Sequence, residues 1–344
     1  MNRNKLFIYS LTSLAVMASS MAHASQLVTA PTFEGGLTAT IGTFYVQPSS
    51  ENLAYEVVTD TSGGINDFES VSTVYNLDPE YSFGLQAALG YIFEDTANGI
   101  ELSYRNLGTS DSASTTFPVD EDSQAQKEEF DNVFTDTNFE AGFELNAFDL
   151  MISQFIDIGT HMQMRFNGGL AYVELEEQGT RDRVTAGDVI DPGKALEELI
   201  QTQTAIAKSE FTGWGPRVGI DARYDFGQGI GIVGGGSLAY YLGEFDFNSN
   251  HVTETFAGPI SASDRTVQDD IDGQSVTNLR ANLGIDYVYF FEGKEGSTLG
   301  LELGYLVDYY ADGVIAVGVN NNNTTVLPYD VTFSGPYLNL KGAF

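Results

Sequence analysis

The chain has 344 residues, of which 48 are acidic and 15 basic, so its formal net charge is −33. This charge argues against nucleic acid as a partner, because phosphate binding needs clustered lysine and arginine. Cysteine is absent, which excludes a disulfide scaffold and a thiolate metal site. The 37 glycines, 23 phenylalanines and 18 tyrosines favour strands and turns over helices.

The N-terminal segment, residues 1–24, is typical of a cleaved secretory signal peptide. Arg3 and Lys5 supply its positive start, a short apolar stretch follows, and a small-x-small cleavage site ends at Ala24. The apolar stretch is shorter than the ~20 residues that a membrane-spanning helix needs. The alternative is a buried N-terminal helix. We expect an exported protein whose mature part, residues 25–344, is one domain.

The rest of the chain shows alternating apolar and polar residues rather than long apolar runs. From Leu299 to Tyr309, for example, apolar residues alternate with a set that includes Gly300, Glu302 and Asp308. Such alternation fits a soluble sandwich or a membrane barrel with lipid outside and water inside. The export signal favours the barrel.

We predict an all-β fold, a transmembrane antiparallel up-and-down β-barrel of about 10 strands, with 8 or 12 left open. Both termini and the short turns are expected on the periplasmic side, and the long loops outside the cell. The predicted strands cover residues 36–47, 81–94, 99–108, 138–158, 161–177, 210–226, 230–247, 275–292, 298–311 and 331–344. The predicted long loops cover residues 48–80, 109–137, 178–209, 248–274 and 312–330.

Two segments depart from this pattern. One short helix is predicted in the third long loop, where Asp191 caps it and Pro192 takes its first position. The apolar stripe of that helix is Leu196, Leu199, Ile200 and Ile206. In residues 138–158 the alternation changes phase near Ala147, which suggests a β-bulge or a broken strand.

Several stretches resemble the Legionella-type major outer membrane proteins, a family of pore-forming proteins. They are Phe33-Glu34-Gly35-Gly36, Phe44-Tyr45-Val46-Gln47-Pro48, Val74-Tyr75-Asn76-Leu77-Asp78-Pro79, Phe83-Gly84, Gly90-Tyr91-Ile92-Phe93, Gly213-Trp214-Gly215-Pro216-Arg217 and Tyr224-Asp225-Phe226-Gly227. The resemblance implies a barrel in the bacterial outer membrane with porin-like activity, in contact with outer-membrane lipid and lipopolysaccharide. The best-known members form disulfide-linked complexes, which this cysteine-free chain cannot do, so a homo-oligomer is left open.

The C-terminus resembles an outer-membrane assembly signal. Leu338, Leu340 and the terminal Phe344 share one face, although Gly342 stands where an aromatic residue is often found. The barrel assembly machinery is therefore an expected partner.

Motifs for catalysis, cofactors and metals are weak. Residues 229–234 match G-x-G-x-x-G but lead into further strand, whereas dinucleotide binding needs a helix there. Residues 270–273 resemble part of a calcium loop without its other ligands, so only loose divalent binding by acidic loops is left open. His161 falls at a turn and His251 in an acidic loop, where a His–Asp pair is left open. We predict no enzyme, no cofactor and no metal site.

Charged residues on the polar faces are the candidate functional site. As a pore lining they would select solutes, whereas as a packed salt-bridge network they would close a narrow lumen. Inward glycines such as Gly84 and Gly304 favour a narrow pore. The predicted pore-lining residues are Arg105, Arg165, Arg217, Asp221, Arg223, Arg280, Asp286, Glu302 and Asp308.

The expected function is passive diffusion of small hydrophilic solutes or ions, with a cation preference from an acidic mouth. The alternative is a non-conducting structural or adhesin barrel that acts through its acidic surface loops, residues 109–137 and 178–209.

Overall fold

The computed structural model describes residues 35–62, 69–94, 96–118, 130–189, 197–256, 261–291, 297–320 and 323–344. The predicted signal peptide, residues 1–24, lies outside these ranges. Nearly all described residues are in strands, and no helix among them is long and apolar enough to cross a membrane. The elements are β1 Gly36–Ser50, the 3-10 turn η1 Glu51–Leu53, β2 Ala54–Ser62, β3 Glu69–Asn76, β4 Ser82–Ile92, β5 Asn98–Pro118, β6 Phe130–Ile158, β7 Met162–Val189, β8 Glu197–Gly227, β9 Ile230–Phe256, β10 Ser261–Phe290, β11 Thr298–Asn320 and β12 Asn323–Ala343.

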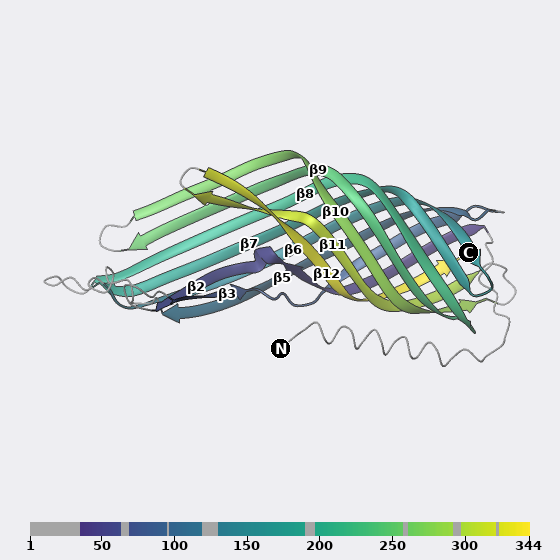
Figure 1. Ribbon diagram of the computed structural model, residues 1–344, viewed down its shortest axis with the longest axis horizontal. Coiled ribbons are helices and arrows are strands. Elements are labelled where there is room, and N and C mark those ends of the chain that lie inside the picture. Colours follow the sequence, from purple (N-terminus) through teal and green to yellow (C-terminus); the bar gives the residue numbers. More distant parts are fainter. Residues whose placement is uncertain are drawn as a thin grey trace.

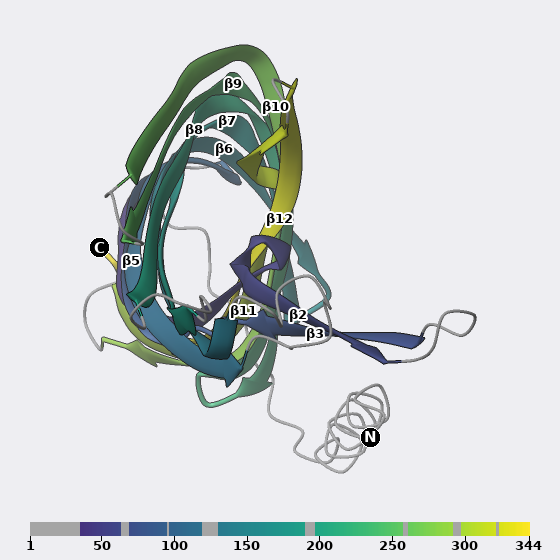
Figure 2. The same ribbon diagram turned by 90° about the vertical axis from the view of Figure 1, so that its left-hand side faces the viewer.

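Ten of these strands close into an antiparallel barrel in the order β1-β12-β11-β10-β9-β8-β7-β6-β5-β4 (Figures 1 and 2). Because β1 pairs with both β4 and β12, the barrel sheet closes without an open edge. β2 and β3 form a separate two-stranded hairpin between β1 and β4. The predicted up-and-down topology and the count of ten barrel strands are confirmed.

The barrel has two different ends. At one end short connections join β4 to β5, β6 to β7, β8 to β9 and β10 to β11, and we call this the short-turn end. The opposite end, which we call the long-strand end, is formed by strands that run far beyond a membrane's thickness (Figure 1). β8 alone has 31 residues, whereas a spanning strand needs about 9–11.

The predicted long loops are therefore mostly strand, which corrects the sequence interpretation. Residues 109–118, 178–189, 248–256 and 314–320 all continue the ladders of their barrel strands. The sequence pattern does not indicate these extensions as strands, because their outer faces meet water and carry polar residues. They therefore lack the outward-facing apolar residues that are typical of a membrane strand.

The predicted helix after Asp191 is also wrong where the structure describes it. Residues 191–196 lie outside the described ranges, but Glu197 begins β8, in which Ile200 faces Ala186 of β7 and Phe256 of β9. Two neighbouring strands offer a complete hydrogen-bond ladder there, and such tertiary pairing overrides a weak helical preference.

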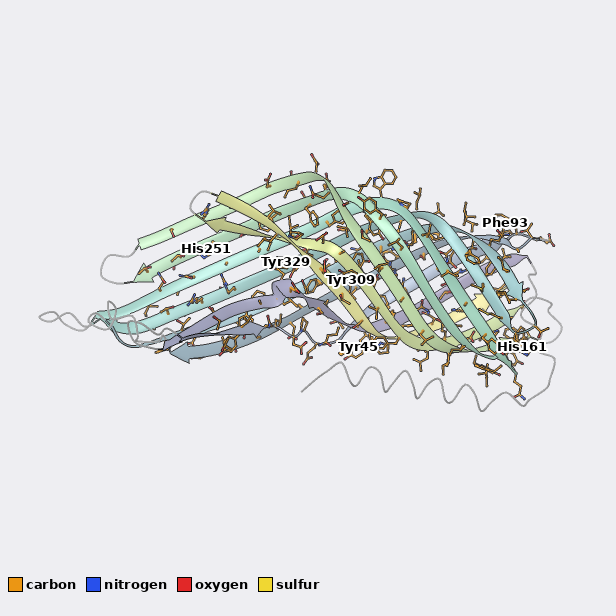
Figure 3. All side chains as sticks on the ribbon, viewed as in Figure 1. Tyr45, Phe93, His161, His251, Tyr309 and Tyr329 are labelled. Carbon is orange, nitrogen blue, oxygen red and sulfur yellow. The ribbon has the colours of Figure 1, made fainter. Side chains whose placement is uncertain are left out.

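The outer surface of the barrel carries an apolar band toward the short-turn end. On β11, Leu301 and Leu303 are 50% and 52% exposed, whereas Glu302 between them is 3% exposed. On β8 the exposed residues Trp214 and Val218 lie on either side of the buried Arg217. The predicted inner and outer faces of these strands are thus confirmed, and aromatic residues such as Phe93 reach the rim of the band (Figure 3).

β6 runs through Ala147 without a register shift, so the predicted bulge there is wrong. What changes is the chemistry of the two faces. Above this point Glu144 is outside and Phe143 inside, whereas below it Phe148 is outside and Asp149 inside. The hydrophobic pattern inverts because the outer face passes from water into the apolar band, while the inner face passes from a core to a polar lumen.

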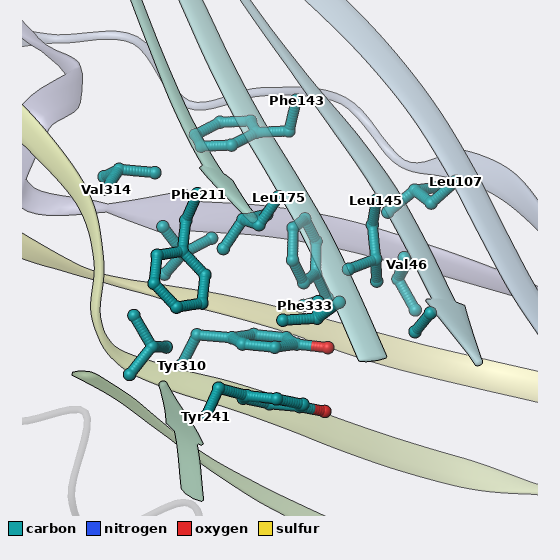
Figure 4. Packing of buried hydrophobic residues seen from close by; sticks show 14 of the residues in the cluster. Val46, Leu107, Phe143, Leu145, Leu175, Phe211, Tyr241, Tyr310, Val314 and Phe333 are labelled. Carbon is teal, nitrogen blue, oxygen red and sulfur yellow. The ribbon is translucent and has the colours of Figure 1, made fainter. Parts of the chain in front are cut away.

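A hydrophobic core fills the lumen beyond the polar section, toward the long-strand end (Figure 4). The rings of Phe143, Phe211 and Phe333 are at most 1% exposed and come from three different strands. Further fully buried members are Val46, Leu107, Leu145, Val173, Leu175, Tyr241, Val276, Tyr310, Val314 and Val331.

Two inward glycines leave no open space, contrary to the sequence expectation. The ring of Phe44 lies where a Cβ on Gly84 would project, and the ring of Tyr337 does the same at Gly304. These two glycines make room for aromatic rings and not for an open lumen.

Candidate functional site in the barrel interior

All nine predicted charged residues lie on the inner face of the barrel, and most of them make ion pairs there. Arg105, Arg217, Asp286, Glu302 and Asp308 are buried, and the other four are partly exposed. Whether they line a conducting pore stays a prediction, because packed ion pairs alone do not define a passage.

The deepest charges form a group that we call the lumen cluster: Arg105, Asp149, Arg217, Asn278 and Asp308. Arg105 pairs with Asp308, and its Nη2 lies 3.9 Å from Asp149 Oδ2. Arg217 Nε lies 2.9 Å from Asp149 Oδ1. Asn278 donates to Asp308 over 2.6 Å and accepts from Arg217 over 2.8 Å. Residues from five strands are therefore tied together across the lumen.

Tyrosines join the lumen cluster to the hydrophobic core. Arg217 Nη2 donates to the hydroxyl of Tyr241 over 2.6 Å, and Arg217 Nη1 donates to Ser237 over 2.9 Å. Tyr310 is fully buried beside them, and its hydroxyl has no hydrogen-bond partner among the described residues. The core thus begins where the charged section ends.

A second layer of ion pairs lies nearer the short-turn end. Arg165 contacts Glu101 at 3.1 Å and Asp221 at 2.8 Å. Farther along, Arg223 contacts Asp286 at 2.7 Å and Asp225 at 2.8 Å.

Lys341 pairs with Glu302 in the same half of the barrel. Apart from Arg223–Asp225, which lies within β8, each of these pairs joins different strands. The network therefore braces the inner wall in addition to the backbone ladder.

A cavity of about 490 Å³ occupies this charged half of the lumen. Its walls reach from strand-end residues such as Thr298 and Ala343 to Arg105 and Arg217. Six cationic and five anionic side chains line it, so the lining is nearly balanced although the whole chain is strongly acidic. The cationic residues are Arg105, Arg165, Arg217, Arg223, Arg280 and Lys341, and the anionic ones are Glu101, Asp149, Asp221, Asp286 and Glu302.

Sequence reasoning missed two members of this site. Asp149 was not predicted on the inner face because the alternation of apolar and polar residues changes phase in β6. It would have been predicted there if the outer face of β6 had been expected to pass from water into the apolar band. Tyr241 follows the glycine-rich residues 229–236, which give no clear apolar–polar alternation, and the structure puts Val233, Ala239 and Tyr241 inside.

A smaller cavity of about 230 Å³ lies in the long-strand half, under the turn η1. Leu53 and Tyr55 are buried there, and the Tyr55 ring stacks on Phe139 at 5.6 Å. Asn52 Nδ2 donates to the buried carboxyl of Glu177 over 2.9 Å. Burial raises the pKa of Glu177 to about 7, and the hydrogen bond from Asn52 only partly opposes that shift.

On the outer face, just beyond the apolar band, five acidic residues stand side by side in register on β6 to β10. We call this the acidic row: Glu144, Glu176, Glu210, Asp246 and Asp270. Directly opposed like charges destabilise a sheet. A hydrogen bond with Asp270 raises the pKa of Asp246, with burial and nearby acidic groups adding to the shift.

One cation relieves part of this repulsion. Lys208 Nζ lies 3.1 Å from Glu176 and 2.9 Å from Glu210. Within the described ranges no three acidic or histidine side chains are arranged to hold a metal ion.

His161 and His251 lie far apart, His161 at the short-turn end and His251 toward the long-strand end (Figure 3). His161 Nδ1 contacts the Thr160 hydroxyl at 2.7 Å, and its ring stacks on Tyr224. His251 lies in β9 opposite Ala205 and Arg265. In the described part of the chain, neither histidine makes an ion pair with a carboxylate.

The family model of the Legionella pneumophila major outer membrane protein precursor matches residues 29–344. No curated protein shows significant similarity to the chain. Among solved structures, the outer membrane protease OmpT from Escherichia coli is 11% identical, with a TM-score of 0.32 and coverage of 93% of this chain and 99% of that one. A major outer membrane protein from Thermus thermophilus is 13% identical, with a TM-score of 0.29 and coverage of 90% and 99%. A FadL homologue from Pseudomonas aeruginosa is 8% identical, with a TM-score of 0.26 and coverage of 90% of each chain. Likenesses this weak carry no conclusion about activity.

Proposed function

Since the chain belongs to the Legionella pneumophila major outer membrane protein family and is thus an outer-membrane protein, we propose that it forms a pore for small hydrophilic solutes or ions. The observation that supports this proposal is the charge-lined cavity of about 490 Å³ behind an apolar outer surface. A polar interior behind a lipid-facing exterior is the arrangement of water-filled barrels. Since the cavity lining is nearly balanced, a modest cation preference of the proposed pore would come from an acidic mouth, where the acidic excess of the rest of the chain acts.

The proposed route runs from the short-turn end through the cavity to the lumen cluster and then meets the hydrophobic core. Phe211 and Phe333 are at most 1% exposed, so the core is the main barrier on this route. We therefore expect a low conductance that depends on transient loosening of the core.

One observation favours a second candidate, a non-conducting structural or adhesin barrel. The core has members on nine of the ten barrel strands, and packed interiors are typical of small barrels. In this case the long strands beyond the apolar band would serve as a contact surface outside the cell.

Planar-bilayer recording of the refolded protein separates the two candidates. A pore gives small, cation-selective current steps, and Phe333→Ala enlarges them because it removes a ring from the core. The control is Val218→Ala, which deletes apolar atoms from the lipid face, where Val218 is 57% exposed. If well-folded parent and Phe333→Ala proteins both stay silent, the structural or adhesin role is correct.

Three expectations remain part of the proposal. Residues 1–24 are removed on export, which N-terminal sequencing of the membrane-inserted protein tests. The C-terminal Phe344 is recognised by the barrel assembly machinery, so its deletion lowers the amount of inserted barrel. The protein is not an enzyme, and hydrolysis of peptides or phospholipids by the purified barrel would contradict this.

A further inference from the structure

Arg280 is a cation in the barrel interior that pairs with no carboxylate of the described residues. Four of the five arginines that line the large cavity have an aspartate or glutamate oxygen within 4.0 Å, and they are Arg105, Arg165, Arg217 and Arg223. Arg280 instead donates from Nη2 to the side-chain oxygen of Gln86 over 3.2 Å. No carboxylate of a described residue lies within ion-pair distance of its guanidinium.

The neighbouring carboxylates are already engaged. Asp308 is the direct cross-strand partner of Arg280, yet it pairs with Arg105 and accepts from Asn278. Asp149 is likewise engaged by Arg217. Among the described residues, the guanidinium groups of Arg105, Arg217 and Arg280 thus face only the carboxylates of Asp149 and Asp308, which leaves one positive charge uncompensated at the inner end of the cavity. Arg280 is partly exposed to the cavity, so an anion that enters the cavity can meet this charge.

Nearby donors are also unsatisfied. Nε and Nη2 of Arg105 are buried and have no hydrogen-bond acceptor among the described residues. Buried polar atoms nearly always have partners, so orphan donors on a cavity wall indicate a missing acceptor such as water or a bound anion. Arg105 and Arg280 both line the cavity.

We propose that the cavity beside Arg280 is a binding site for a small carboxylate anion. A guanidinium presents a planar fork of donors that matches the two oxygens of a carboxylate. The cavity of about 490 Å³ far exceeds the ~30 Å³ share of one water molecule, so an anion of a few heavy atoms fits. The site does not rest on the proposed pore, because binding to the refolded barrel needs no passage through the core.

Titration of the refolded full chain with ¹³C-labelled acetate, followed by the line width of the acetate NMR signal, tests the site. The parent binds acetate, and Arg280→Gln weakens binding at least about tenfold, because a hydrogen-bonded charge partner is lost. The control is Arg265→Gln, the same change at an exposed position of the same strand, which keeps the parental affinity. Equal binding by Arg280→Gln and the parent would overturn the proposal. Binding of phosphate but not acetate would overturn the carboxylate assignment.

A second measurement needs no variant and covers the case in which Arg280→Gln does not fold. Phenylglyoxal modifies accessible arginines, and mass spectrometry follows the rate at each position. Acetate at saturating concentration slows modification of Arg280 at least about tenfold and leaves the exposed Arg265 unchanged, since bound anion shields only the cavity. Equal rates at Arg280 with and without acetate contradict the site.

Discussion

Arg105 on β5 and Asp308 on β11 form an ion pair across the lumen, although β12, β1 and β4 lie between their strands on the shorter way round the ring. At the same height Arg280 on β10 reaches Gln86 on β4. Gln86 faces Arg105 in register, and Arg280 faces Asp308. Two neighbouring cross-links therefore hold opposite walls of the barrel together where the cavity meets the core.

Asp308→Asn should destabilise the barrel strongly. Arg105 is 3% exposed, and removal of the Asp308 charge leaves its guanidinium with only the 3.9 Å contact to Asp149, at a cost of about 3–5 kcal/mol. Guanidinium unfolding of the refolded protein measures the loss. Asp272→Asn, the same change at an exposed position of β10, should alter stability by less than ~0.5 kcal/mol. Equal stabilities of both variants would show that the pair across the lumen contributes nothing.

Leu303→Arg should impair insertion into lipid, because Leu303 is 52% exposed within the apolar band. Arginine on the lipid face costs about 2–4 kcal/mol at the bilayer midplane. Refolding yield into lipid vesicles measures the effect. Glu302→Gln on the inner face should insert normally and alter ion preference if the lumen conducts. Normal insertion of Leu303→Arg would place this segment outside the membrane.

Stability should fall as pH rises toward 7 because of Glu177. Its folded-state pKa of about 7 exceeds the ordinary 4.5, so the folded protein binds a proton that the unfolded chain has already released. The stabilisation is complete below pH ~4.5 and is lost as pH rises to about 7, with a total of roughly 3 kcal/mol. Thermal unfolding from pH 5 to 8 measures it.

Glu177→Gln should flatten this part of the pH profile, because glutamine does not ionise. Glu140→Gln, at an exposed site on the outer face of β6, should leave the slope unchanged. A parental slope in Glu177→Gln would assign the effect to another group.

Added salt should stabilise the long-strand half, because it screens repulsion along the acidic row. Asp246→Asn should raise the melting temperature at low salt and reduce its dependence on salt, since it removes the charge opposite both Glu210 and Asp270. Calorimetry at about 0.01 and 0.15 M salt measures both effects. A lower melting temperature in Asp246→Asn would mean that its hydrogen bond with Asp270 outweighs the repulsion.

The sequence by itself determined the local features of this protein. Period-2 alternation predicted ten strands and the correct inner and outer faces of segments such as Leu299–Tyr309, because each strand there separates lipid from a polar interior. The family followed from short motifs spread along the chain, and the family match over residues 29–344 confirms it. The nine charged residues were predicted on the inner face for the same reason, since successive residues of a strand point to opposite faces.

Only the tertiary structure decided what those inner side chains contact and how far the strands extend. The partner of Arg105 is Asp308, 203 residues away, and no local pattern encodes which charges meet across a closed ring. Beyond the apolar band the outer face lies in water and the inner face packs into a core, so the hydrophobic pattern inverts, and the extension of β8 before residue 210 was predicted as a loop. Alternation shows which face of a strand meets an apolar environment and which meets a polar one. Those environments depend on where the barrel lies in the membrane.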